Sequence, residues 1–220
     1  MLKIERLIQI PSAFSLTSNK IARVIYWLST DYVKVDTWDR PKNRFDYIDA
    51  LEIELENGIF LEMDLDGFVV HEDPERRAVN LGIRLTYHSN HQSQLERYDG
   101  GCSFDASLSE AWRMSINHNA DSVEIYQNSE AIKLTGNAKI FEIHGLNLEI
   151  TDENTLVTSY PACMEIKISP IESIYICTGT YIENEDKISQ SLGRLIVISS
   201  KEVAKYYGIG PYCGLNRSNI

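Results

Sequence analysis

The sequence predicts a mainly β protein whose antiparallel, meander-type sheets could form two packed β units, with two short helices. Three observations support this prediction. Apolar and polar residues alternate along many short segments, as expected for strands that bury one face. Gly, Asn, Asp and Pro separate these segments at the short intervals of a meander. Helix-start signals occur at only two places.

The segment 21–28 is the first candidate strand. Its apolar residues also fit one face of a helix, but its β-branched and aromatic residues favour a buried strand. The polar segment 36–47 contains Pro41 and is expected to be an exposed loop. Two strands follow within 51–65, and the later strands are expected at 82–87, 122–127, 131–134, 139–144, 146–151, 156–160, 163–169, 173–178 and 192–199.

Capping boxes predict both helices. Ser199 and Glu202 have the Ser-x-x-Glu spacing in which each side chain binds the other residue's backbone N–H at a helix start. This box predicts a helix over 200–207, which Gly208 ends in the left-handed conformation. The same spacing at Ser107 predicts a second, shorter helix.

The polar stretch 91–101, which ends in Asp-Gly-Gly, is a candidate linker. It would divide the chain into an acidic β unit over 1–90 and a neutral β unit over 102–220 that ends in the capped helix. A single fused domain is the alternative, because 220 residues fit either arrangement.

The net charge of the chain is concentrated in one segment. The chain has 32 Asp and Glu residues against 21 Lys and Arg residues, which gives a net charge of −11. Eleven of the acids and none of the bases lie in 46–75, so acids and bases are equal in number elsewhere. A pI near 4.9 argues against nucleic acids and anionic membranes as partners. It favours a basic protein partner or a divalent cation.

Cysteine usage and hydropathy indicate the compartment. Cys102, Cys163, Cys177 and Cys213 are far apart in the sequence and lack CxxC spacing, so neither a disulfide framework nor a zinc site is predicted. Charged residues interrupt the apolar residues at the start of the chain, so no signal peptide is expected. No stretch approaches 18 uncharged apolar residues, so no membrane span is expected. We therefore expect a cytoplasmic protein with reduced thiols.

Two alternating segments on either side of an Asn-Gly pair predict a hairpin. A two-residue turn would place Ile53 opposite Glu62 and mix apolar with charged residues on both faces. A shift of one residue instead places Ile53 opposite Leu61 and Glu52 opposite Glu62. Burial specifies the register, so we predict the shifted pairing, with a three-residue loop that ends in a left-handed Gly58.

This register gathers acidic side chains on the outward face of the hairpin. We predict that the face is exposed and binds a basic partner, because acids directly opposite each other destabilise a sheet by up to about 1 kcal/mol. A sequence shaped for stability alone would mix bases among them. The predicted partner-binding residues are Glu52, Glu54, Phe60, Glu62, Asp64 and Asp66 on the hairpin and Trp38 in the preceding loop. A face that only keeps the protein in solution is the alternative.

Other chemistry has weaker support in the sequence. The segment 62–73 partly matches a calcium-binding loop, but its ends lack the Asp and the bidentate Glu with which such a loop begins and ends. His88 and His91 are expected to be exposed loop residues, so no metal site is predicted. No nucleophile elbow, P-loop or dinucleotide-binding motif is present, so neither catalytic residues nor a cofactor are predicted.

The sequence therefore predicts a cytoplasmic, non-enzymatic, acidic protein-binding module. In character it is similar to small acidic immunity proteins, which neutralise basic secreted toxins such as nucleases, although no motif supports this similarity. It implies an inhibitor of a basic toxin. The alternatives are a divalent-cation-binding β protein and a hydrolase that uses carboxylates in a cleft between two β units. Exposed strand edges could also support a homodimer.

Overall fold

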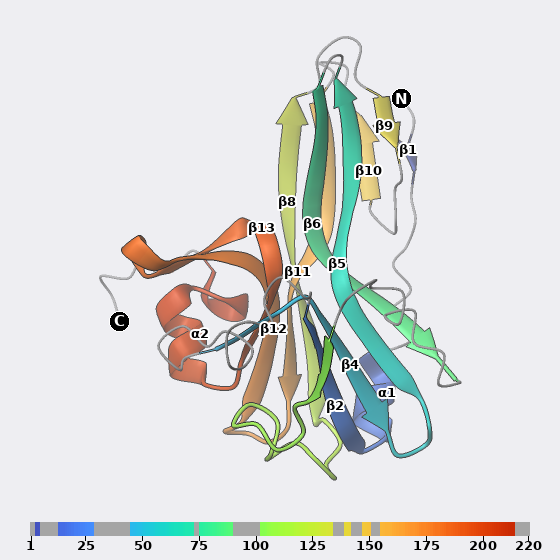
Figure 1. Cartoon of the computed structure of the whole chain (residues 1–220), viewed down its shortest axis with the longest axis vertical. Coiled ribbons are helices and arrows are strands. Elements are labelled where there is room, and N and C mark those ends of the chain that lie inside the picture. The colour runs from blue at the N-terminus through green and yellow to red at the C-terminus, as the bar shows by residue number, and fades with distance from the viewer. Residues whose placement is uncertain are drawn as a thin grey trace.

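The computed structural model describes residues 3–4, 13–28, 45–72, 75–89, 102–133, 139–141, 147–150 and 155–213. It describes only the backbone of 3–4, 13–15, 66–72, 75–81, 128–133, 139–141, 147–150, 155–160 and 190–192. Within these ranges the structure confirms the predicted fold class, with two antiparallel sheets and two short α-helices (Figure 1).

The first sheet, sheet A, is built around one long strand, β11 (Thr155–Lys167). One edge of β11 pairs with β8 (Ser122–Lys133), and the other edge pairs first with β10 (Asn147–Ile150) and then with β12 (Ser173–Ile182). The remaining strands of sheet A are β1 (Lys3–Ile4) beside β10, β13 (Lys187–Ile198) beside β12, and β3 (Asp46–Ile48) beside β13.

The second sheet, sheet B, is built around β5 (Phe60–Glu72) and β6 (Glu75–His88), which pair along their whole length. β4 (Ala50–Leu55) pairs with the first part of β5, and β9 (Lys139–Phe141) pairs with its last part. The sheet continues through β2 (Ile21–Leu28) to the edge strand β7 (Cys102–Asp105). The uncertain assignment of 21–28 is therefore resolved as a strand.

Each sheet contains strands from both sides of the candidate linker. β3 precedes the linker and lies in sheet A, whereas β7 and β9 follow it and lie in sheet B. The two halves of the chain therefore exchange strands. Residues 91–101 lie outside the described residues, so the predicted boundary stays a prediction.

Two pairs of predicted strands are continuous in the structure. β8 contains both 122–127 and most of 131–134, and β11 contains both 156–160 and most of 163–169. Pro161 lies beside a register shift between β11 and β8. A proline at a bulge loses no ladder hydrogen bond, so the strand continues where the sequence suggested a break.

The two sheets pack face to face around one apolar core. Alternate residues of each strand point into it, which is the pattern that the sequence predicted. The buried side chains include Val24, Tyr26, Leu51, Ile53, Leu61 and Met63 from sheet B, and Ile48, Met164, Ile166, Ile174, Ile176, Leu195 and Val197 from sheet A.

A second, smaller cluster covers the outer face of sheet A. Helix α2 (Lys201–Tyr207) and the 3-10 helix η5 (Gly210–Tyr212) pack there, on the side of β12 and β13 (Figure 1). A further 3-10 helix, η4 (Glu183–Glu185), joins β12 to β13. The buried members of this cluster include Phe45, Cys163, Tyr175, Cys177, Ile196, Ile198 and Tyr207.

The C-terminal helix forms as predicted but is capped by the next serine. Ser200 is the N-cap of α2, and its Oγ accepts a hydrogen bond from the backbone N–H of Val203 at 3.3 Å. The box predicted from Ser199 is therefore wrong by one residue. Gly208 ends the helix with a φ of 68°, as predicted.

The helix predicted after Ser107 does not form, and the segment is a series of turns. The reason is that Ser107 Oγ accepts a hydrogen bond from the backbone of Val24 on β2, at 3.0 Å, instead of capping its own segment. The second α-helix is instead α1 (Ala13–Ser18), which buries Leu16 completely and is not preceded by a Ser-x-x-Glu capping box. Among the described residues, no helix is long and apolar enough to cross a membrane.

The exposed loop predicted over 36–47 is wrong at its C-terminal end. Phe45 is 1% exposed and Asp46 is 0% exposed, and Asp46 begins β3. Asp46 is tolerated there because its Oδ2 accepts a 2.7 Å hydrogen bond from the hydroxyl of Tyr26. Trp112 Nε1 donates in turn to the Tyr26 oxygen at 2.7 Å.

Candidate partner-binding site

The predicted hairpin forms in the predicted register. Ile53 pairs with Leu61 and Glu52 pairs with Glu62. Leu55 N–H donates to the Ile59 carbonyl at 2.8 Å, and Gly58 has a φ of 78°. The three-residue loop with a left-handed glycine is thereby confirmed.

Glu52 and Glu62 occupy the position where cross-strand side chains come closest. The bond between Leu55 and Ile59 marks a hydrogen-bonded pair, and such pairs alternate along an antiparallel ladder. Counting back from it makes Glu52 and Glu62 a non-hydrogen-bonded pair. The Cα atoms of such a pair are about 4.5 Å apart.

The predicted exposure of this face is wrong for most of its described residues. Glu52 is 2% exposed, Glu62 3%, Asp64 4% and Phe60 7%, and Glu54 is half-buried. Alternation identifies the side of the sheet on which a residue lies, but it does not tell whether that side reaches solvent. The side chain of Asp66 and the whole of Trp38 lie outside the described residues.

An arginine and a histidine missed by the sequence analysis come from the neighbouring strand β6. Arg84 Nε donates to Asp64 Oδ1 at 2.8 Å, and a second bond joins Arg84 to Asp64 Oδ2. This two-bond pairing compensates the Asp64 charge. The alternation of residues 83–88 places Arg84 and His88 on one face of a strand. This pattern could have predicted that both residues lie on the same side of the sheet.

His88 was expected in an exposed loop, but it ends β6 and contacts the acidic cluster. Its Nε2 lies 3.0 Å from Glu62 Oε2, although the geometry is not that of a hydrogen bond. The contact is therefore an ion pair when the imidazole is protonated. His91 lies outside the described residues.

Glu52 differs from the other two carboxylates. Within the part of the chain that the structure describes, Asp64 pairs with Arg84 and Glu62 lies beside His88, but no ion pair or hydrogen bond involves Glu52. A carboxylate at 2% exposure that directly faces another carboxylate is a costly arrangement without a cation. Glu52 and Glu62 therefore form an acidic site on the outward face of sheet B.

Apolar and aromatic side chains flank this site on β2. Ile25 pairs with Glu52 across the β2–β4 ladder, and Trp27 lies two residues further along the same face. Trp27 Nε1 is buried and has no hydrogen-bond acceptor among the described residues. An aromatic ring beside paired carboxylates suits a lysine or arginine side chain, which can contact both.

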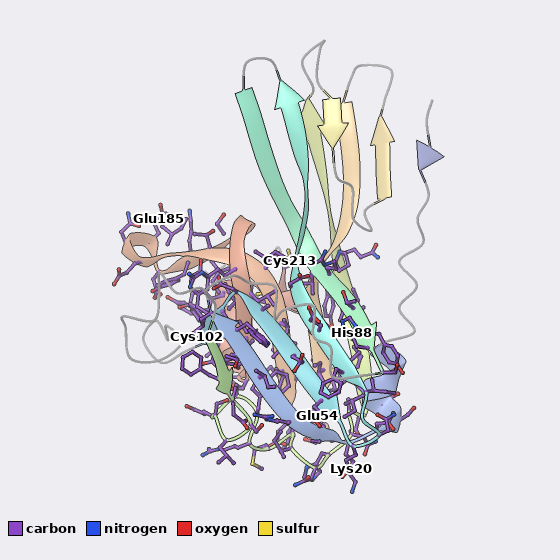
Figure 2. All side chains as sticks on the ribbon, turned by 45° about the vertical axis from the view of Figure 1, so that its right-hand side comes forward. Lys20, Glu54, His88, Cys102, Glu185 and Cys213 are labelled. Carbon is purple, nitrogen blue, oxygen red and sulfur yellow. The ribbon has the colours of Figure 1, made fainter. Side chains whose placement is uncertain are left out.

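Among the described side chains of the hairpin, the accessible acidic ones lie at its turn end. Glu54 is half-buried and Glu56 is exposed. Glu56 forms an ion pair with Lys20, whose Nζ lies 3.8 Å from Glu56 Oε1. Glu54 lies toward the same end of the sheet as Lys20 (Figure 2).

The described residues contain no cluster of three or more Asp, Glu, His or Cys side chains that could hold a metal ion. The backbone of 60–72 is a continuous strand paired with β6, so the match of 62–73 to a calcium loop does not correspond to a loop. Alternating carboxylates on a strand reproduce the spacing of such a loop without its conformation.

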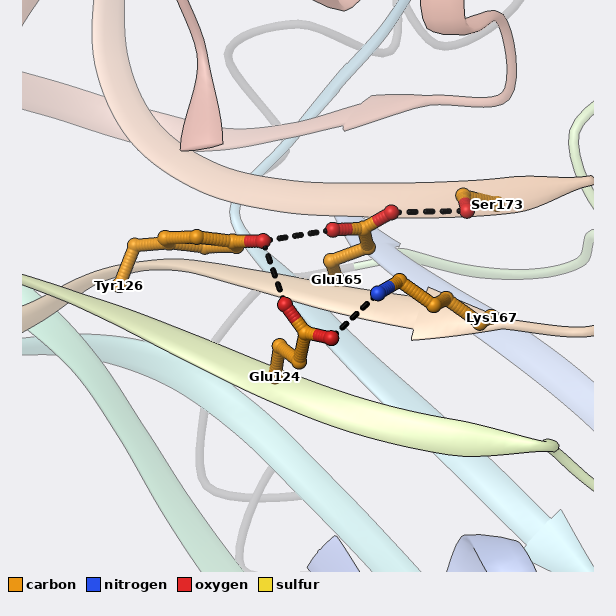
Figure 3. A network of polar contacts seen from close by, with 5 residues as sticks. All are labelled: Glu124, Tyr126, Glu165, Lys167 and Ser173. Atoms are coloured by element: carbon orange, nitrogen blue, oxygen red, sulfur yellow. Dashed lines mark hydrogen bonds and ion pairs between the residues drawn. The ribbon is translucent and has the colours of Figure 1, made fainter. Parts of the chain in front are cut away.

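A second polar network lies on the outer face of sheet A (Figure 3). Tyr126 Oη lies 2.7 Å from Glu165 Oε2 and 2.8 Å from Glu124 Oε2. Ser173 Oγ donates to the other oxygen of Glu165 at 2.8 Å, and Lys167 pairs with Glu124. The network therefore links β8, β11 and β12 across the sheet.

The pKa shifts of Tyr126 and Glu124 oppose the use of the phenol as a nucleophile and of the Glu124 carboxylate as a general base. Burial, followed by the adjacent Glu165 and Glu124 carboxylates, raises the pKa of the Tyr126 phenol far above its ordinary value. The phenol therefore stays protonated and donates its single hydrogen to one carboxylate at a time. The hydrogen bond from Lys167 lowers the pKa of Glu124. These bonds connect side chains of three neighbouring strands on the outer face of sheet A.

No protein-family model, curated protein or solved structure matches this chain.

Proposed function

We propose that the protein is a non-enzymatic binding module that recognises a basic protein partner through the outward face of sheet B. The observation that supports this proposal is the buried Glu52 carboxylate, which faces Glu62 and forms no ion pair within the described residues. A lysine or arginine of the partner, inserted between these two carboxylates, would supply the missing charge. Trp27 and Phe60 would contact its aliphatic part.

The burial of the face determines how such a partner would bind. The exposed Glu56 and the half-buried Glu54 at the hairpin turn would attract a basic surface and raise the association rate. Contact with Glu52 requires the face to open further, so a conformational step would follow the encounter. The partner class that we propose is a basic toxin, which the module would neutralise as an immunity protein does.

The test is capture from native host lysate by the purified full chain at low and at high salt. The variant Glu52→Gln removes the Glu52 charge with little change of shape, and Glu183→Gln, on the exposed η4, is the control with the same change of net charge. We expect wild type and Glu183→Gln to retain the same basic protein and to release it in salt. Glu52→Gln should lose about 2–5 kcal/mol of binding free energy, measured by calorimetry with the purified partner.

Two results would contradict the proposal. One is a basic protein that Glu52→Gln and Glu183→Gln bind with equal affinity, which would place the interface elsewhere. The other is the absence of any salt-released protein from all three captures. The toxin assignment has its own readout, because the module should abolish the partner's toxic activity at equimolar concentration.

A further inference from the structure

The ladder between β11 and β12 brings together two cysteines that are separated in the sequence. Cys163 on β11 and Cys177 on β12 are direct partners in the antiparallel ladder. Both are free thiols, at 2% and 0% exposure, in the cluster beneath α2 and η5. Gly210 of η5 packs against the pair, since a Cβ added to it would lie 3.5 Å from Cys163 Sγ.

The backbone hydrogen bonds determine the type of position that the two cysteines occupy. Ile168 N–H donates to the Glu172 carbonyl at 2.9 Å at the turn end of the β11–β12 hairpin, so these residues form a hydrogen-bonded pair. Hydrogen-bonded and non-hydrogen-bonded pairs alternate, and Cys163–Cys177 is five steps away, so it is a non-hydrogen-bonded pair.

A non-hydrogen-bonded pair has a geometry that a disulfide can bridge. Its Cα atoms are about 4.5 Å apart and its side chains are close. A disulfide joins Cα atoms about 4.4–6.8 Å apart. Because Cys163 and Cys177 lie on the same face of the sheet, their Sγ atoms can meet with little movement of the backbone.

We propose that Cys163 and Cys177 form an inter-strand disulfide when the chain folds in the presence of a low-molecular-weight disulfide such as oxidised glutathione. One cysteine thiolate attacks the glutathione disulfide and releases one glutathione thiolate, which leaves a mixed disulfide on the protein. The second cysteine thiolate attacks that mixed disulfide and releases the second glutathione. Two S–H bonds of the protein break, one S–S bond forms, and two electrons reduce the oxidant to two thiols.

The burial of the pair explains why folding is the stage at which the bond forms. Burial raises the pKa of Cys177 to about 12 and raises that of Cys163 well above its ordinary value. The folded, reduced pair therefore has almost no thiolate at neutral pH and little contact with solvent. Cys213, by contrast, is exposed, and it lies apart from Cys102 (Figure 2).

The test is refolding of the full chain from denaturant in a glutathione redox buffer, with a fully reduced sample refolded in parallel. Lys167 lies between Cys163 and Cys177, so trypsin places them in separate peptides, 140–167 and 168–187. We expect these two peptides to be linked in wild type and in Cys102→Ala, and the link to be absent in Cys177→Ala. The oxidised wild type should have a melting temperature several degrees above that of its reduced form, because the disulfide lowers the conformational entropy of the unfolded chain.

The peptide map of wild type tests the proposal even if Cys177→Ala does not fold, and Cys163→Ala is a second variant that removes the same bond. A link between 140–167 and 206–217, which contains Cys213, would overturn the proposal in favour of a different pairing. Free Cys163 and Cys177 after refolding under conditions that form disulfides readily would also overturn it.

Discussion

Glu52 and Glu62 face each other at a non-hydrogen-bonded position of the β4–β5 ladder, and both are buried. β6 provides His88 beside Glu62 and Arg84 beside Asp64, but within the described residues no ion pair involves Glu52. Proteins tolerate an uncompensated buried charge at functional sites more readily than elsewhere. The arrangement supports the proposal that a basic partner binds to this face of sheet B.

The ion pair between Arg84 and Asp64 should contribute strongly to stability. The Asp64 side chain is 6% exposed, so Arg84→Gln leaves a buried carboxylate without its cation. We expect Arg84→Gln to lower the free energy of unfolding by about 2–4 kcal/mol, and the double variant with Asp64→Asn to recover much of it. Urea denaturation of the single and double variants measures both effects.

The matched control for this prediction is the exposed pair of Arg23 and Asp105, whose side chains are 45% and 50% exposed. Arg23→Gln should cost no more than about 1 kcal/mol. Equal losses of unfolding free energy in Arg23→Gln and Arg84→Gln would show that the buried ion pair contributes no more to stability than the exposed one.

The Tyr26 hydroxyl connects two buried polar groups in the main core. Trp112 Nε1 donates to it and it donates to Asp46, each at 2.7 Å. Tyr26→Phe removes the partner of the indole and one donor to the carboxylate, so we expect a loss of about 2–4 kcal/mol of unfolding free energy. Tyr87→Phe makes the same change at a residue that is 47% exposed and should stay within about 0.5 kcal/mol of wild type.

The two adjacent serines before α2 should differ in their effect on the helix. Ser200 caps α2, and Ser199 does not. Ser200→Ala should cost about 1 kcal/mol and speed hydrogen exchange at the Val203 amide, whereas Ser199→Ala should do neither. A loss of stability in Ser199→Ala but not in Ser200→Ala would instead show that Ser199 caps the helix.

Stability should fall in alkaline solution because of the groups buried beneath α2 and η5. Cys177 titrates near pH 9 when unfolded but at about 12 when folded, because burial disfavours the thiolate. Burial likewise raises the pKa of Tyr126 and Tyr175. At a pH between the unfolded-state pKa and the folded-state pKa of such a group, the folded state holds more protons than the unfolded state. The unfolding free energy therefore decreases as the pH rises. Each such group contributes at most about 1.4 kcal/mol per pH unit.

The measurement is chemical denaturation at a series of pH values from 7 upward, on the reduced protein. Cys177→Ala should show a shallower decline above about pH 9 than wild type. Cys102→Ala, which removes a thiol outside the cluster, should decline as wild type does. A wild-type stability that is constant up to about pH 11 would contradict the prediction.

Local patterns predicted local structure well. The alternation around Asn57 and Gly58 predicted the hairpin, its register and its left-handed glycine, because a shift by one residue would exchange the two faces of the sheet. Ser107 shows the limit of such patterns. It had the spacing of a helix cap, but β2 offered its hydroxyl a backbone donor that lies far away in the sequence.

By itself, the sequence determined that the protein is mainly β, which residues pair in the acidic hairpin, and that its carboxylates share one face. Only the tertiary structure decided that this face is buried, that Arg84 and His88 lie beside two of the carboxylates, and that Cys163 lies opposite Cys177. The physical reason is that side-chain alternation and turn geometry act between near neighbours in the chain. Exposure and charge compensation instead depend on which distant strands lie side by side.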